Sequence, residues 1–278
     1  MNREKKNREK KNREKKNREK KNGVKEAGKK IVFFDIDGTL VSHAGKSHVP
    51  EPTVEAVECL KKNGHVPAIA TARNRVLTRK IAAFFGIGLL VCCNGAHVVR
   101  GEDDIFTTCL DEDFTKIFRA EAFSHSPNAY ALDMENVYTD MDEENFKTFL
   151  IEQAGFDCRK NLAAMNRAQL AYIFAPLPHS WRGYGNVDAI ETARYTEFRP
   201  PQVSKWSGIL TASAAAGFDI ESVVTVGDGL NDLEMVRNAP LGLAVGGAKE
   251  ELKAVADLVT EDIDEGGILS AFRRLNMI

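Results

Sequence analysis

A buried strand that ends in two acidic residues is the feature that most constrains this chain. Residues 31–34 read Ile-Val-Phe-Phe, an apolar run typical of a strand inside a parallel sheet. Asp35 and Asp37 follow, and alternate residues of an extended chain face the same side, so both carboxylates should project together. Two like charges this close are costly unless a cation or a shared proton relieves them. A hard cation with oxygen ligands, Mg²⁺, is the simplest solution.

Strands and helices alternate after this point, which predicts an α/β fold with a parallel sheet and crossover helices. The helical spacing of Val54, Val57 and Leu60 predicts a helix that begins near Pro52 and ends at Gly64. The other predicted core strands are 65–70, 89–93, 222–226, 241–245 and 258–259, and the other predicted core helices are 75–85, 206–216, 232–238 and 250–256.

The alternation is interrupted between residues 97 and 199 by a mixed order of elements. The sequence there predicts strands at 104–110, 129–138, 171–174 and 187–198, and helices at 113–124 and 143–154. Pro200 and Pro201 mark the far boundary, after which the alternation resumes. We therefore expect a Rossmann-like core in two parts, residues 30–97 and 200–278, with an inserted α+β module at 98–199.

The N-terminal segment is a basic repeat. Residues 2–21 are four copies of Asn-Arg-Glu-Lys-Lys, whose five-residue period matches neither a helix nor a strand and whose residues include none that is apolar. We expect residues 1–29 to form a solvated, disordered tail. An arm for nucleic acid or a membrane surface is the alternative, and it is disfavoured because no aromatic residue lies beside the charges to stack on bases.

The cysteines and the apolar runs indicate a cytoplasmic protein. The five cysteines form no Cys-x-x-Cys pair and are odd in number, which is typical of reduced thiols (Cys59, Cys92, Cys93, Cys109 and Cys158). No apolar run approaches the roughly 20 residues that a membrane span needs. The charged N-terminus lacks the apolar segment of a secretory signal.

Further polar groups follow the predicted core strands. Thr71 ends the second strand, Lys205 opens the helix after the insertion, and residues 227–232 read Gly-Asp-Gly-Leu-Asn-Asp after a later strand. Ligand sites of open α/β sheets lie at the carboxyl ends of the strands, so these groups should converge with Asp35 and Asp37. Carboxylates that attack phosphorus or hold Mg²⁺, with a lysine, a hydroxyl and N–H groups for phosphate oxygens, suit phosphoryl transfer.

In this order the motifs resemble those of the haloacid dehalogenase superfamily. The matching residues are Asp35-Ile36-Asp37-Gly38-Thr39, Thr71, Lys205 and 227–232. The insertion lies between the second and third motifs and follows Asn94-Gly95-Ala96, as in the C2-capped Cof-type phosphatases that the chain resembles. The resemblance covers about residues 30–278 and implies the core and cap of that family.

The resemblance also implies a role for each motif residue. Asp35 would be the nucleophile that forms an aspartyl-phosphate, and Asp37 the general acid and base. The implied Mg²⁺ groups are Asp35, the backbone carbonyl of Asp37, Asp228 and Asp232, the last orienting metal-bound water or Lys205. The implied phosphate contacts are Thr71, Lys205, Asn231 and the amides of Ile36 and Ala72. Relatives usually carry Gly where this chain has Ala72, and we expect activity to survive because Ala is small.

We therefore predict a Mg²⁺-dependent phosphatase of small phosphorylated metabolites, with no nucleic-acid or membrane partner. Sugar phosphates are favoured by the resemblance alone. A phosphomannomutase-like enzyme, which returns the phosphoryl group to a sugar hydroxyl, is an alternative that the motifs do not separate. A non-catalytic binding protein is disfavoured because a binder need not retain four carboxylates at one edge. A calcium-binding loop is excluded, because Leu40 and Lys46 stand where an EF-hand starting at Asp35 needs Gly and Glu.

Overall fold

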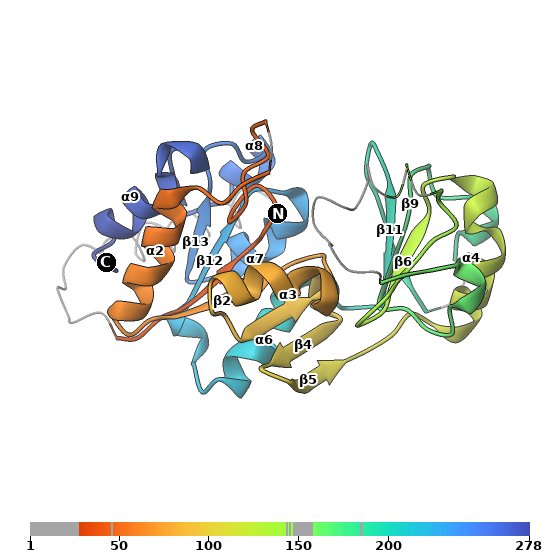
Figure 1. Ribbon diagram of the computed structural model, residues 1–278, viewed down its shortest axis with the longest axis horizontal. Coiled ribbons are helices and arrows are strands. Elements are labelled where there is room, and N and C mark those ends of the chain that lie inside the picture. Colours follow the sequence, from red (N-terminus) through yellow and green to blue (C-terminus); the bar gives the residue numbers. More distant parts are fainter. Residues whose placement is uncertain (1–27, 46, 143, 145, 147–157, 184–185) are drawn as a thin grey trace, which may run out of the picture.

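The computed structural model describes residues 28–45, 47–142, 144, 146, 158–183 and 186–278, which form two lobes (Figure 1). Each lobe is built on one sheet, a larger sheet of eight strands and a smaller sheet of six. The tail expected at 1–29 and the helix expected at 143–154 lie almost wholly outside the described residues. Within the described residues, no helix has the length and apolar character needed to cross a membrane.

The larger sheet has the strand order β14-β13-β12-β1-β2-β3-β4-β5. Its parallel strands are β1 (Ile31–Phe34), β2 (Val66–Ala70), β3 (Leu89–Cys92), β12 (Val223–Gly227), β13 (Leu241–Ala244) and β14 (Leu258–Val259). The chain first builds outward from β1 to β2 and β3 and later returns to the other side of β1 as β12. This reversal beside β1 is the position at which open α/β sheets bind ligands.

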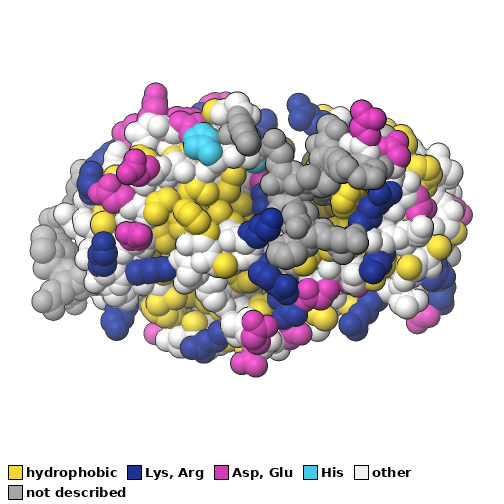
Figure 2. Space-filling view, viewed as in Figure 1, with side chains coloured by type: hydrophobic (Ala, Val, Ile, Leu, Met, Phe, Trp, Pro, Cys, Tyr) yellow, Lys and Arg dark blue, Asp and Glu magenta, His cyan; other side chains and the backbone are white. Residues whose placement is uncertain are grey.

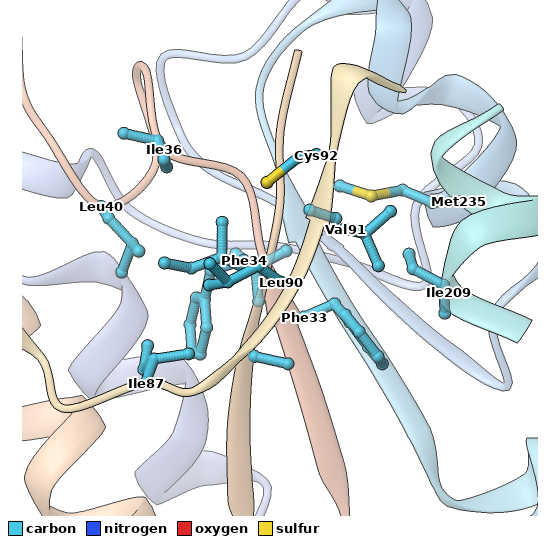
Figure 3. Close-up of a cluster of buried hydrophobic side chains, with 14 of the residues drawn as sticks. Phe33, Phe34, Ile36, Leu40, Ile87, Leu90, Val91, Cys92, Ile209 and Met235 are labelled. Atoms are coloured by element: carbon cyan, nitrogen blue, oxygen red, sulfur yellow. The ribbon is translucent and has the colours of Figure 1, made fainter. Parts of the chain in front are cut away.

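Helices cover both faces of the larger sheet, as the predicted alternation requires. They are α2 (Glu51–Lys62), α3 (Arg75–Phe84), α6 (Lys205–Ala215), α7 (Leu233–Asn238), α8 (Glu250–Lys253) and α9 (Gly267–Arg274). Phe33 and Phe34 are fully buried and point to opposite sides of β1, Phe33 towards Ile209 of α6 (Figure 3). The ring of Phe34 meets the ring of Phe272 of α9 edge to face at 6.0 Å. The central strand is therefore apolar on both faces because it is covered on both.

The smaller sheet has the order β10-β11-β9-β6-β7-β8. Its strands are β6 (Tyr130–Leu132), β7 (Val137–Tyr138), β8 (Arg159–Lys160), β9 (Leu170–Ile173), β10 (Asp188–Glu191) and β11 (Thr196–Arg199). Helix α4 (Glu112–His125) packs on one face, where Phe114 and Phe118 surround Phe198. The other face contributes Leu170 and Tyr172 to the buried cluster of the larger lobe, so this face is turned towards the core.

One strand that was predicted for the insertion belongs to the larger sheet. We expected the strand at 104–110 to belong to the insertion, but β4 (His97–Arg100) and β5 (Asp103–Thr107) extend the larger sheet as an antiparallel hairpin. The expected division after residue 97 therefore falls inside a sheet that continues to Thr107. Antiparallel strands can follow one another without a crossover helix. The alternation of strands and helices therefore stops at β4 although the sheet continues, and this was interpreted as the start of a new domain.

Two long predicted strands are hairpins. The strand expected at 129–138 is β6 and β7, separated by a turn in which Asp133 Oδ1 accepts hydrogen bonds from the backbone N–H groups of Glu135 and Asn136 at 2.8 and 2.6 Å. The strand expected at 187–198 is β10 and β11, with Thr192 at the turn. Side chains that form hydrogen bonds with the nearby backbone compete with strand pairing, so Asp133 and Thr192 favour turns where continuous strands were predicted. Helix α8 ends at Lys253, three residues before the predicted end.

Candidate active site

The expected motif residues lie at the carboxyl ends of three neighbouring strands. Asp35 follows β1, Thr71 follows β2 and Asp228 follows β12, all at the same edge of the larger sheet. Backbone bonds fix the first two, because Asp35 N–H donates to Val226 at 3.0 Å and Thr71 N–H donates to Val91 at 2.8 Å. The sheet therefore gathers groups that are far apart in the sequence, as predicted.

Lys205 is buried between two carboxylates. Its Nζ atom lies 2.7 Å from Asp35 Oδ1 and 2.7 Å from Asp232 Oδ1, and its side chain is 0% exposed. Ser204 caps the start of α6 by accepting from Ser207 N–H, which makes Lys205 the first residue of the helix. Burial alone would lower the pKa of Lys205, but the attraction of Asp232 and Asp35 raises it. The lysine is therefore a fixed positive charge beside Asp35.

Three carboxylates meet closely enough to share a cation. Asp35, Asp228 and Asp232 each offer an oxygen within 4.8 Å of the others. Burial, followed by the neighbouring acids, raises the pKa of Asp35 well above its usual range, although Lys205 opposes this. Burial and Asp232 raise the pKa of Asp228 to about 6. Carboxylates held this close at such cost are a donor set that suits a hard divalent cation such as Mg²⁺.

Both carboxylate oxygens of Asp232 accept hydrogen bonds from other groups of the protein. Oδ1 pairs with Lys205, and Oδ2 accepts from the backbone N–H groups of Asp228 and Gly229 at 3.0 and 2.9 Å. Asp228 is held in turn by a 3.1 Å hydrogen bond from Thr39 Oγ1 to its Oδ1. Asp232 therefore shapes the loop that carries Asp228, in keeping with the orienting role that the resemblance implies.

The side chain of Asp37 is not part of this cluster of three acids, although the sequence predicted that it would project together with Asp35. Its carboxylate receives two hydrogen bonds from Arg73, one of them 2.8 Å long from Nε to Oδ2, and Oδ1 lies 3.1 Å from His43 Nε2. The rule for alternate residues holds only in an extended chain, and the chain bends at Ile36, between the two acids. Burial would raise the pKa of Asp37, but the bonds to His43 and Arg73 lower it below its usual range.

The expected phosphate contacts surround the same edge. Thr71 Oγ1 accepts from the N–H of Arg73 at 3.2 Å, and the amide of Asn231 lies 3.5 Å from Asn94 Oδ1. Ile36 is buried in the turn that follows β1, and Ala72 is half-buried between Thr71 and Arg73. The roles of these residues towards phosphate stay predictions.

Four residues at the site had no predicted role: His43, Arg73, Asn94 and Glu197. Asn94 belongs to the segment Asn94-Gly95-Ala96 named above, and Arg73 directly follows Thr71 and Ala72, so both positions gave a signal that was not followed. His43 and Glu197 lie outside the motifs and gave no signal: the contact of His43 with Asp37 depends on how the loop after β1 folds back, and the contact of Glu197 with Asn94 joins residues far apart in the sequence. Glu197 comes from β11 of the smaller sheet and accepts a hydrogen bond from Asn94 at 2.9 Å.

A groove lies beside the two partners of Asp37. It has a volume of about 300 Å³, and its lining combines His43 and Arg73 with apolar side chains from the segment after β1 and from α3 (Val41, Val49, Leu77, Ile81 and Phe84). Figure 2 shows hydrophobic side chains gathered next to a histidine on this side of the larger lobe. The groove thus shares His43 and Arg73 with the surroundings of Asp37.

An open parallel sheet with an acidic, lysine-containing edge at its reversal point, joined to an inserted lobe, defines a class of α/β enzymes that act on phosphate groups. Residues 32–272 match the sequence model of the haloacid dehalogenase-like hydrolases. The chain belongs to this family and is an enzyme, a hydrolase.

Named relatives cover nearly the whole chain. The candidate phosphatase YkrA of Bacillus subtilis strain 168 is 28% identical over 255 residues, which are 90% of this chain and 98% of YkrA. A phosphoglycolate phosphatase of Methanopyrus kandleri is 25% identical over 260 residues, 88% of this chain and 96% of that protein.

Solved structures agree with the fold. The HAD subclass IIB sugar phosphatase BT4131 superposes with a TM-score of 0.78 at 25% identity, covering 90% of this chain and 100% of its own. A protein of Geobacillus kaustophilus HTA426 gives a TM-score of 0.75 at 29% identity, with the same coverage. The predicted core-and-cap fold and the predicted superfamily are therefore confirmed.

Proposed function

We propose that the protein is a Mg²⁺-dependent phosphatase that hydrolyses small phosphorylated metabolites through an aspartyl-phosphate at Asp35. The observation that carries this proposal is the Asp35–Lys205–Asp232 contact next to Asp228. It supports the proposal because the carboxylate proposed as nucleophile lies beside a buried lysine and beside acids that could bind a cation. With Mg²⁺ bound to the acids, its positive charge and that of Lys205 would together attract the negative charge of a phosphate monoester.

In the first step, an oxygen of Asp35 attacks phosphorus and the bond from phosphorus to the leaving oxygen breaks. The leaving oxygen takes a proton from Asp37. In the second step, Asp37 takes a proton from water, the water oxygen attacks the same phosphorus, and the bond to Asp35 breaks to release inorganic phosphate. Asp35, the backbone carbonyl of Asp37 and Asp228 would hold Mg²⁺, with Asp232 orienting metal-bound water or Lys205, and the bound cation would supply positive charge to the phosphoryl oxygens.

The contacts of Asp37 favour one of its two roles. Arg73 and His43 stabilise the ionised carboxylate, which is the form that accepts a proton from water. Protonating the leaving oxygen needs the acid form, so we propose that these contacts loosen when substrate binds. Thr71, Lys205, Asn231 and the amides of Ile36 and Ala72 would hold the phosphoryl oxygens.

The smaller lobe is proposed to act as the cap that selects the substrate. Its limits were expected at 98–199, and assigning β4 and β5 to the core sheet moves the proposed start to residue 108. Sugar phosphates are the favoured substrates, supported by the likeness to BT4131, a sugar phosphatase. The free thiols support a cytoplasmic location.

The decisive experiment measures release of inorganic phosphate from a panel of sugar phosphates, phosphoglycolate, nucleotides, pyridoxal phosphate and flavin mononucleotide. Release in Mg²⁺ but not in EDTA supports the proposal. Isomerised sugar phosphate without free phosphate would identify a mutase, and binding without any reaction would identify a non-catalytic protein.

A further inference from the structure

Glu197 carries a buried carboxylate from the smaller lobe into the site of the larger one. It lies on β11 and is 4% exposed. Its Oε2 atom accepts hydrogen bonds from Asn94 Nδ2 at 2.9 Å and from the Tyr172 hydroxyl at 3.0 Å. A buried carboxylate is costly unless it is hydrogen-bonded, so the two donors hold it in place. Nothing in the proposed chemistry uses this group.

The carboxylate of Glu197 fixes the orientation of the Asn94 side-chain amide. Oε2 receives two donors, so Asn94 must turn its NH₂ group towards Glu197. Asn94 Oδ1 is then the atom that faces Asn231, whose Nδ2 lies 3.5 Å away. The orientation of one amide therefore sets the orientation of the other, because an amide offers donors at one end and an acceptor at the other.

Contacts of the backbone and of aromatic rings hold both residues of the Glu197–Asn94 hydrogen bond in place. The backbone N–H of Asn94 donates to the carbonyl of Thr71 at 3.0 Å, and Asn94 adopts a left-handed φ of 49°. On the smaller sheet, Tyr130, Tyr172 and Glu197 are cross-strand neighbours in one row, and the rings of Tyr130 and Tyr172 lie 4.9 Å apart. Glu197 thus stands on a packed strand and meets a packed loop.

We infer that Glu197 is a positioning residue: through Asn94 it aims the Asn231 amide at the phosphoryl group, so phosphate binds best when the smaller lobe is docked as in this structure. This inference rests on the proposed function, in which Asn231 contacts phosphate. It gives the cap a role in holding the phosphoryl group itself, separate from any contact with the rest of the substrate.

The test measures the dissociation constant of inorganic phosphate by calorimetry in the presence of Mg²⁺, together with kcat and KM for a small aryl phosphate. Glu197→Met removes the acceptor and should weaken phosphate binding about tenfold, the size expected for one hydrogen bond to a charged group. KM should rise with it, and kcat should change less. Glu197→Gln retains an acceptor oxygen and should stay within about threefold of the parent.

A double-mutant cycle shows whether Glu197 acts through Asn231. Asn231→Ala should weaken phosphate binding, and adding Glu197→Met to it should have no further effect. The matched control is Glu121→Gln, which alters a cap carboxylate bonded to Trp181 at 2.9 Å and should leave phosphate binding unchanged. If Glu197→Met does not fold, Asn94→Gly tests the same relay with a residue that accepts the left-handed backbone.

Three results would overturn the inference: unchanged phosphate binding in Glu197→Met or, where that variant does not fold, in Asn94→Gly; additive effects with Asn231→Ala; or an equal loss in Glu197→Gln. Failure of the proposed function has a different signature. The parent protein would then release no phosphate from any ester, whereas the calorimetric comparison of the variants is independent of turnover.

Discussion

Arg73 and Asp37 face each other through two hydrogen bonds, with Arg73 Nε 2.8 Å from Oδ2 and Nη2 bonded to Oδ1. This pairing of a planar guanidinium with a carboxylate is stronger and more directional than a single bond. It orients the residue proposed as general acid and base, and it lowers the pKa of that residue.

Replacing Arg73 with Met should move the acidic limb of the pH–kcat profile to higher pH. The cation that lowers the pKa of Asp37 is gone, so less of the carboxylate is ionised at a given acidic pH. The folded-state pKa of Asp37 lies below its ordinary value of 3.8, so the contact stabilises the fold above that value and is lost as the pH falls through the folded pKa. Arg79→Met, which alters an exposed arginine of α3, is the control. An unmoved limb would show that Arg73 does not tune Asp37.

Replacing Lys205 with Met should destabilise the protein by about 3–5 kcal/mol and abolish phosphate release. The substitution leaves the carboxylates of Asp35 and Asp232 buried without their cation. Thermal unfolding in EDTA measures the loss of stability. Lys116→Met removes an exposed lysine that pairs with Glu112 and should leave both the melting temperature and activity near those of the parent. A variant as stable as the parent would contradict the account of the buried ion pairs.

Stability in EDTA should depend on Asp228. The folded pKa of Asp228, about 6, lies above its ordinary value of 3.8, so its cost to the fold is present above pH 6 and is relieved as the pH falls. Mg²⁺ should therefore raise the melting temperature more at pH 7.5 than at pH 5.5, because protons compete for the same oxygens. Asp228→Asn should lose most of this difference, while the exposed Asp219→Asn should keep it. Equal Mg²⁺ effects at both pH values in the parent would refute the assignment.

Gly38 and Gly45 form a matched pair for substitution by Ala. Their φ angles are 82° and 80°, so both variants carry the same backbone strain, about 1–2 kcal/mol. A Cβ at Gly38 would lie 2.3 Å from Asp228 Oδ2, whereas a Cβ at Gly45 would meet nothing within 4 Å. Gly38→Ala should therefore be the less stable variant in urea unfolding, and it should bind Mg²⁺ more weakly. Equal effects would mean that the approach to Asp228 has no consequence.

The two acids of the first motif should differ in the intermediate that they allow. With an activated aryl phosphate, Asp37→Asn should still be phosphorylated but should hydrolyse the adduct slowly, since general acid–base help is typically worth ~10²–10⁴-fold. Mass spectrometry should then find phosphate on the peptide that contains Asp35. Asp35→Asn should show no adduct. Phosphate found on Asp37, a serine or a histidine would overturn the proposed mechanism.

Local patterns predicted the strands and turns that the chain makes with its near neighbours. The apolar run at β1 and the polar residues after β1, β2 and β12 located the site, because strand ends of a parallel sheet meet at one edge. Which sheet β5 joins depends on pairing with β4, and the sequence of β5 alone does not carry that information. The contact between Asn94 and Glu197 joins residues from two sheets, and the His43–Asp37 bond depends on how the loop after β1 folds back. Neither contact can be predicted from the short-range periodicity of the sequence.

The connection between the smaller lobe and Lys205 is short. Strand β11 ends at Arg199, and Ser204 already caps the helix whose first residue is Lys205. Only residues 200–204 connect them, and a turn from Pro200 to Val203 takes up part of that length. A movement of the lobe is thus passed to the start of α6 over a few peptide units. During evolution, insertions should accumulate in the turns of the smaller sheet, and the length of this connection should vary far less.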